Sequence, residues 1–213
     1  MELVKMTVSA FVDETASDSP APGGGSVSAL AGSLASALGQ MVIRLTTGKK
    51  AFASLDEKTQ EEFKAQLPKL EKAQKRLVEI IDEDTQAFNA FMEALKLPKD
   101  TDEQKAKRNK AMSDATVVAM QVPLETAKTC LEVLRFLPIV ALHGNKNAAS
   151  DAGVAALNAR SGLEGAILNV KINLGGIDDA PLCEKTRAEC NKMLEEGEKL
   201  KTEILKTIYS KIE

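Results

Sequence analysis

Residues 23–47 read GGGSVSALAGSLASALGQMVIRLTT, and this stretch decides the fold. Thirteen of the 17 residues from 23 to 39 are Gly, Ala or Ser. The larger apolar residues recur at steps of three and four, as Val27, Leu30, Leu34, Leu38, Met41 and Leu45. That spacing predicts a helix. Small residues four apart, such as Gly32 and Ser36, let a neighbouring helix approach closely. We therefore expect a central helix packed on nearly all sides, by its own bundle or by a second copy of the chain.

The composition favours a soluble protein. The chain has 213 residues, 44% hydrophobic and 28% charged, with a formal net charge of −3. This length supports a real core, and the charge balance excludes a polybasic nucleic-acid coat. Aromatic residues make up only 3%, which argues against stacking on single-stranded nucleic acid. The central stretch is nearly long enough to cross a bilayer, but Gln40 and Arg44 interrupt it, so no membrane partner is expected.

Cysteine, histidine and the N-terminus exclude further classes. Three cysteines are too few and too scattered for a disulfide framework. The single histidine, His143, has no second metal-ligating His or Cys at a suitable spacing, so no metal site is expected. The first five residues lack the pattern of a signal peptide, and we expect a cytoplasmic protein.

The rest of the chain divides at glycine and proline clusters into segments that read as helices. We expect helices near 6–17, 57–95 with a kink at Pro68, 101–140, 147–173 and 179–213, besides the central one. In the segment 57–95 the residues expected to face inward are Leu67, Leu70, Leu77, Ile80, Ile81, Phe88 and Phe91. No segment shows the sustained alternation of a strand. The sequence predicts one all-α domain over residues 1–213, a bundle of about six helices.

Three glycines, Gly23 to Gly25, open the central helix after Pro22. Their free N–H groups, at the positive end of the helix dipole, suit an anion or the polar edge of a ligand. The alternative is that the glycines only let the chain turn tightly against a neighbour.

Asn169 and Asn173 lie one turn apart on an otherwise apolar helix. Because a buried amide without a partner costs about 1–3 kcal/mol, they indicate a polar lining that faces a cavity or a partner. Asp84 shares a helix face with Phe88, so its carboxylate either points into a pocket with a raised pKa or pairs with a lysine at the edge of the core. Asp82 points to the opposite side.

A second polar group follows the central helix and the turn at Gly144. Lys49 and Lys50 come directly after Gly48, at the C-terminus of the central helix. Cations stabilise the negative end of the helix dipole there, and they are also able to bind a carboxylate of a ligand. Asn147 and Asp151 are one turn apart at the start of the next helix. Helix capping alone is the alternative explanation for that pair.

In order and at matching intervals, these motifs resemble the formiminotetrahydrofolate cyclodeaminase and methenyltetrahydrofolate cyclohydrolase family. The resemblance runs from about residue 6 to 212. The motifs are Pro22-Gly23-Gly24-Gly25, Gly48-Lys49-Lys50, Asp84 with Ala87-Phe88, Val122-Pro123-Leu124, Gly144-Asn145 with Ser150-Asp151, and Asn169-Val170 with Ile172-Asn173.

The resemblance implies an all-helical, homodimeric enzyme of one-carbon metabolism that needs no metal and no cofactor beyond its tetrahydrofolate substrate. Two reactions occur in the family. One hydrolyses 5,10-methenyltetrahydrofolate to 10-formyltetrahydrofolate. The segment from Ser150 to Asn173 is slightly more similar to the stand-alone cyclohydrolases that catalyse this reaction. The other closes 5-formiminotetrahydrofolate to the methenyl compound with loss of ammonia. The family also occurs fused to a formiminotransferase, and a length of 213 residues suggests the stand-alone form.

The resemblance also implies site residues. Asp84 and Asp151 are the candidate acids or bases, because a carboxylate stabilises the cationic methenyl bridge and moves protons. The candidate substrate-binding residues are Gly23, Gly24, Gly25, Ser26, Lys49, Lys50, Asn145, Ser150, Asn169 and Asn173. Among these, the lysines would contact the carboxylates of the glutamate tail. A non-catalytic helical dimer and a folate-binding protein without chemistry are the alternatives.

Overall fold

The computed structural model describes residues 2–213, which form eight α-helices and three short 3-10 helices, with no strand in that range. The α-helices are α1 (Val8–Thr15), α2 (Gly24–Thr47), α3 (Lys50–Ala53), α4 (Glu57–Lys64), α5 (Gln66–Leu95), α6 (Asp102–His143), α7 (Ala149–Asn173) and α8 (Ala180–Ile212). The 3-10 helices are Leu3–Lys5, Lys146–Ala148 and Leu174–Gly176. The prediction of an all-α bundle is confirmed.

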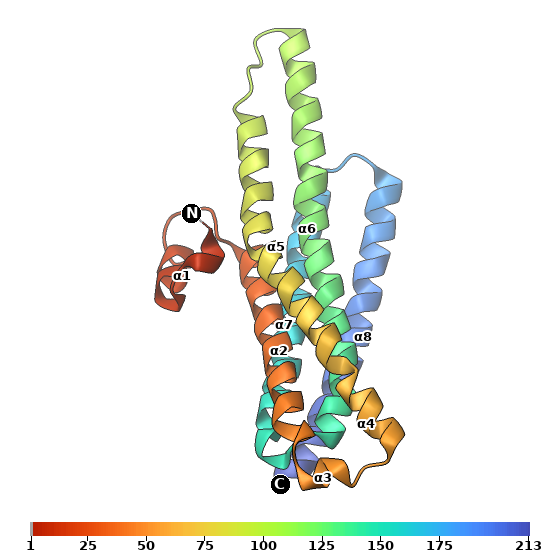
Figure 1. Cartoon of the computed structure of the whole chain (residues 1–213). Coiled ribbons are helices and arrows are strands. Elements are labelled where there is room, and N and C mark those ends of the chain that lie inside the picture. The colour runs from red at the N-terminus through yellow and green to blue at the C-terminus, as the bar shows by residue number, and fades with distance from the viewer. Residues whose placement is uncertain (1) are drawn as a thin grey trace.

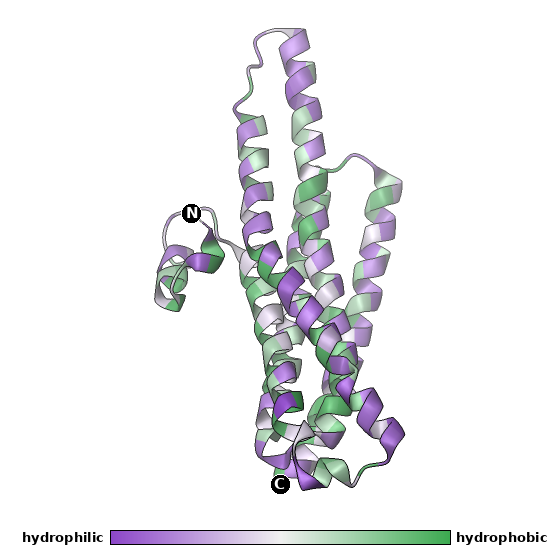
Figure 2. Ribbon diagram, viewed as in Figure 1, coloured by the Kyte–Doolittle hydropathy of each residue, from purple (hydrophilic) through white to green (hydrophobic). Residues whose placement is uncertain are grey.

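Five long helices, α2 and α5 to α8, form the bundle (Figure 1). α2 and α7 run antiparallel, because Gly24 at the start of α2 lies beside Asn169 near the end of α7, while Thr46 bonds Asn145 just before α7. The C-terminal half of α5 and the N-terminal half of α6 form a hairpin that extends beyond the other helices. Figure 2 shows hydrophilic residues over much of this hairpin.

Most expected helices are present, with shifted ends. The helix expected over 57–95 is two helices that meet at Ala65, and the kink predicted at Pro68 is wrong. Pro68 lies in the first turn of α5, where its missing N–H would have no helical partner anyway. α6 begins as predicted at a capping box of Thr101 and Gln104, and it continues through Pro123 and Pro138.

Over its first four turns α2 turns small residues inward and larger ones towards the surface, while Val42 and Ile43 near its end are buried. Gly32, Ala35, Ser36 and Gly39 are buried in the bundle, whereas Leu34 remains 51% exposed. Within residues 2–213, α2 is the one helix long and apolar enough to cross a bilayer, with a mean hydropathy of 1.4 over 18 residues. Of that window, 61% is buried inside the bundle, and the remainder is an apolar surface strip.

Glycines allow α2, α6 and α7 to meet at backbone distance. A Cβ on Gly162 of α7 would lie 2.8 Å from the Ser28 carbonyl oxygen and 2.9 Å from Cys130 Sγ. A Cβ on Gly32 of α2 would lie 2.5 Å from the same sulfur. Cys130 is fully buried in this notch, and burial raises the pKa of its thiol to about 12. It therefore packs as a small neutral group between the three helices.

This contact gives a test of the packing. Gly162→Ala should lower the free energy of unfolding by about 1–3 kcal/mol, because the new methyl group meets a backbone carbonyl that cannot rotate away. Gly175→Ala is the control, since a Cβ there meets nothing within 4 Å. Its free energy of unfolding should stay within about 0.5 kcal/mol of the parent. Urea denaturation followed by circular dichroism measures both, and equal effects of the two variants would contradict the proposed close packing.

Candidate functional site

A pocket of about 710 Å³ lies where the start of α2 meets α5, α6 and the end of α7. Its lining residues are Pro20, Ala21, Gly23, Gly24, Gly25, Asp84, Phe88, Phe91, Asn109, Met112, Ser113, Thr116, Ala119, Asn169, Ile172, Asn173, Gly176 and Asp178. The volume is typical of a site for a small molecule or cofactor. Six of the residues predicted for a site meet here, namely Gly23, Gly24, Gly25, Asp84, Asn169 and Asn173.

Asp84 projects from α5 towards the first turn of α2. Its Oδ2 accepts hydrogen bonds from the Ser26 backbone N–H at 2.9 Å and the Ser26 hydroxyl at 3.2 Å. Burial raises the pKa of Asp84 above its ordinary value, and the bonds from Ser26 offset only part of that effect. The carboxylate is thus a stronger base than an exposed aspartate, held in a fixed position at the pocket wall.

Gly25 makes this position possible. A Cβ on Gly25 would overlap the carboxylate of Asp84, so any side chain here would push the acid away from α2. A Cβ on Gly24 would lie 3.0 Å from Asn169 Nδ2. The glycines therefore bring polar side chains of α5 and α7 against the backbone of α2.

Ser26 does not line the pocket, although it was predicted to bind substrate. Its side chain is completely buried, and its single hydroxyl proton is shared between the Ile81 carbonyl oxygen at 2.9 Å and Asp84 Oδ2 at 3.2 Å. The sequence places Ser26 after three glycines, but one helical step turns its side chain inward against α5. Ser26 is a positioning residue that acts through Asp84.

The two asparagines of α7 line the pocket, and each side-chain amide donates to a backbone carbonyl oxygen. Asn173 Nδ2 donates to the Ala119 carbonyl oxygen at 2.6 Å, and Asn169 Nδ2 donates to the Gly165 carbonyl oxygen at 2.9 Å. These bonds occupy an amide N–H of each side chain and fix its orientation. The two Oδ1 atoms are then available to accept hydrogen bonds from a ligand.

The lining of the pocket mixes apolar and polar residues, and the sequence analysis missed several of them. Phe88 and Phe91, expected to face the core, are half-buried and line the pocket instead. On α6 the lining residues Asn109, Met112 and Thr116 recur at helical spacing. This helical spacing is visible in the sequence, but polar residues with such spacing are also typical of the solvent-exposed face of a helix, so they do not by themselves indicate a pocket.

Five predicted site residues lie far from this pocket, which corrects the expectation that one chain brings them together. They are Lys49, Lys50, Asn145, Ser150 and Asp151. Asp151 and Asn173 are at opposite ends of α7, which at 1.5 Å per residue separates them by about 33 Å. Asn145 Nδ2 donates to the Leu45 carbonyl oxygen at the C-terminal end of α2. We call these five residues the distal group.

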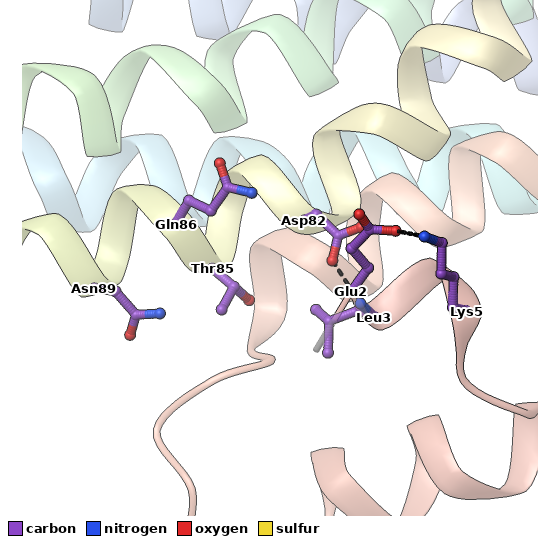
Figure 3. A pocket seen from close by; sticks show the side chains of 7 residues that line it. All are labelled: Glu2, Leu3, Lys5, Asp82, Thr85, Gln86 and Asn89. Carbon is purple, nitrogen blue, oxygen red and sulfur yellow. Dashed lines mark hydrogen bonds and ion pairs between the residues drawn. The ribbon is translucent and has the colours of Figure 1, made fainter.

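A second, polar pocket of about 580 Å³ lies beside the N-terminal segment (Figure 3). Asp82 faces this side of α5, as predicted, and its Oδ1 accepts a hydrogen bond from the Leu3 backbone N–H at 2.6 Å. Leu3 is the one apolar side chain of this lining. No group of three or more His, Cys, Asp or Glu residues suited to a metal ion occurs within residues 2–213.

Comparisons with known proteins agree with the geometry. A family model for formiminotransferase-cyclodeaminase matches residues 7–192. The methenyltetrahydrofolate cyclohydrolase of Methylorubrum extorquens is 40% identical over 206 residues, which are 97% of each chain. The crystal structure of formiminotetrahydrofolate cyclodeaminase from Thermotoga maritima superposes with a TM-score of 0.77 at 27% identity, covering 99% of this chain and 98% of that one.

A longer relative shows how the domain is reused. The formimidoyltransferase-cyclodeaminase of Gallus gallus is 38% identical over 195 residues, which are 92% of this chain but only 35% of the relative. The chain thus spans about a third of that bifunctional relative and nearly all of the cyclohydrolase. The family match, the sequence identity and the shared fold confirm the resemblance: this chain belongs to the formiminotransferase-cyclodeaminase family.

Proposed function

We propose that this chain is an enzyme of one-carbon metabolism that hydrolyses 5,10-methenyltetrahydrofolate to 10-formyltetrahydrofolate in the pocket between α2, α5, α6 and α7. The 40% identity to a methenyltetrahydrofolate cyclohydrolase over 97% of both chains supports this reaction. The observation that carries it is the half-buried carboxylate of Asp84, held against the start of α2 at the wall of the pocket. Neither a metal nor a cofactor beyond the tetrahydrofolate substrate enters the proposal.

Asp84 has the position and basicity for the proton transfers. The methenyl bridge is cationic, and a nearby carboxylate stabilises it in a water-poor pocket. A water molecule adds to the bridge carbon and gives a proton to Asp84. The bond from that carbon to N5 then breaks, N5 gains the hydroxyl proton, and the formyl group stays on N10. The balance is one water consumed and one proton released.

The remaining lining suits a reduced pterin. Ring N–H and amino groups of the pterin are donors, and the Oδ1 atoms of Asn169 and Asn173 accept from them. Phe88 and Phe91 supply aromatic walls for the flat rings of the substrate. The lining of the second pocket contains no aromatic residue.

Cyclodeamination of 5-formiminotetrahydrofolate is the second candidate. The Thermotoga neighbour and the bifunctional relatives are named for that activity. The same carboxylate would serve, because ring closure by N10 and loss of ammonia also need proton transfer at nitrogen.

We also propose that the protein is a homodimer joined through the exposed faces of α2 and α7. Large apolar side chains gather on these neighbouring helices: Val27, Leu34, Met41 and Leu45 on α2, and Val154, Leu157, Leu168 and Ile172 on α7, each at least 36% exposed. We call these eight residues the apolar face. Exposed large apolar side chains on neighbouring helices are typical of a protein–protein interface, and on α7 the exposed Ser161 and Glu164 interrupt the group.

The reaction is tested by following the absorbance of the methenyl group, once from 5,10-methenyltetrahydrofolate and once from the formimino compound. Decay from the first without formation from the second supports hydrolysis, and formation from the second supports cyclodeamination. If reduced folates raise the melting temperature without turnover, the protein is a folate-binding protein. If neither turnover nor a shift in melting temperature is observed, the remaining reading is a non-catalytic dimer.

The role of Asp84 is tested by Asp84→Asn. Loss of the base should lower kcat by about 100- to 10,000-fold. Burial raises the pKa of Asp84 in the folded state, so the wild type loses stability as the pH rises from about 4, the unfolded pKa, through the folded one. The variant avoids that loss and should be at least as stable at pH 7. The wild-type rate should rise with pH through the same raised pKa.

Asp82→Asn is the matched control, because Asp82 lies two residues away on the opposite side of α5 and bonds only the N-terminal segment. Its kcat should stay near that of the wild type. Full turnover by folded Asp84→Asn would remove the carboxylate from the mechanism.

The dimer is tested by light scattering. Leu34→Glu places a charge at the middle of the apolar face and should give a monomer. Tyr209→Glu changes a similarly exposed residue of α8, outside this face, and should leave a dimer. A monomeric wild type would contradict the proposal.

A further inference from the structure

The second pocket, beside the N-terminal segment, has no part in the reaction as described so far. One wall is built by Leu3, whose buried side chain packs with Ile80 and Ile81 and whose backbone N–H donates to Asp82. Six of the seven described lining residues are polar. A polar cavity of about 580 Å³ is large enough to hold water.

The two pockets reach the contact between α5 and the first turn of α2 from different sides. Asp84 lines the pocket of the proposed reaction, and Thr85, the next residue of α5, lines the second pocket (Figure 3). The described linings share no residue. Ser26 of α2 is completely buried and bonds both side chains. A single buried hydroxyl therefore connects the two pockets.

Asp84, Ser26 and Thr85 form a continuous chain of hydrogen bonds. Ser26 Oγ lies 3.2 Å from Asp84 Oδ2 and 3.3 Å from Thr85 Oγ1. In the contact between the two hydroxyls, either oxygen is able to donate. Because a hydroxyl both accepts and donates, a row of hydroxyls is able to pass a proton from one end to the other. The row leads from the carboxylate to the second pocket.

The direction of the Ser26 hydroxyl depends on the charge of Asp84. While Asp84 is ionised, the Ser26 proton is shared between the carboxylate and the Ile81 carbonyl oxygen. Once Asp84 is protonated, it becomes a donor, and Ser26 accepts from it. The Ser26 proton is then free to turn towards Thr85. Protonation of the acid thus reverses the bonds of the chain.

The proposed hydrolysis ends with a proton on Asp84. The acid has to lose this proton before it serves as a base again, and burial raises its pKa, so the proton is held firmly. A bound folate fills the space that Asp84 faces in its own pocket. The hydroxyl chain offers a way out on the other side.

Resting on the proposed function, we propose that Ser26 and Thr85 relay the released proton from Asp84 to water in the second pocket. A half-turn of the carboxyl group first brings its protonated oxygen to Ser26. Asp84 gives this proton to Ser26 Oγ, Ser26 gives its own to Thr85 Oγ1, and Thr85 gives its own to water. Each hydroxyl gains one proton and loses one, so the net change is one proton moved from Asp84 to water.

The relay is tested with Thr85→Val, which keeps the branched shape and removes the hydroxyl. Single turnovers with enzyme in excess over 5,10-methenyltetrahydrofolate are followed by stopped flow, through the methenyl absorbance and a pH indicator in weak buffer. In the wild type, methenyl decay and proton release should have the same rate. In Thr85→Val, methenyl decay should stay within about twofold of the wild type, because Asp84 and its bonds from Ser26 remain, while proton release should be slower by about tenfold or more.

Two further variants serve as controls. Thr85→Ser keeps a hydroxyl at this position and should restore proton release at the rate of methenyl decay. Asp82→Asn changes the same pocket but leaves the hydroxyl chain intact, so its two signals should also coincide. A merely structural role of Thr85 would slow methenyl decay and proton release together.

The outcomes separate the relay from the proposed function. If the wild type shows no methenyl decay, the proposed function is wrong, and the relay fails with it. With an active wild type, three results overturn the relay alone: proton release that already lags in the wild type, proton release that keeps pace in Thr85→Val, or equal slowing of both signals in that variant.

Discussion

The close approach of α2 to α6 and α7 is the constraint on which the rest of the structure depends. Gly32 and Gly162 bring three backbones together around the thiol of Cys130, and no larger side chain fits there. Once the small residues of α2 face inward, its leucines must face outward. One packing choice therefore produces both a tight bundle and an apolar outer face, so the core packing and the exposed apolar side chains come from the same helix.

The same constraint creates the chemistry. Because Gly24 and Gly25 have no side chains, α5 and α7 bring Asp84 and Asn169 against the start of α2. Two donors from Ser26 orient the carboxylate, while burial keeps its proton affinity high. A rigid helix start thus holds a carboxylate that is both fixed in position and more basic than one on a solvated loop.

Much of this could be predicted from the sequence, because helical periodicity and capping are local. The capping box at Thr101, the opposite directions of Asp82 and Asp84, and the shared face of Asn169 and Asn173 all follow from spacing alone. The side of α2 that faces inward does not follow from spacing, because a stripe of leucines predicts an apolar face but not whether the same chain or a partner covers it. The position of the distal group also could not be predicted, because it depends on the antiparallel course of α2 and α7 rather than on any local pattern.

The α5–α6 hairpin extends beyond the other helices (Figure 1), and Phe88 and Phe91 of α5 and Met112 of α6 line the pocket near the start of α2. Beyond the other helices, each of these two is braced mainly by its neighbour, so a slight tilt at the hairpin base changes the breadth of the aromatic slot and leaves the glycine-packed interior untouched. The aromatic wall of the candidate site and the glycine-packed interior consequently lie in different parts of the molecule.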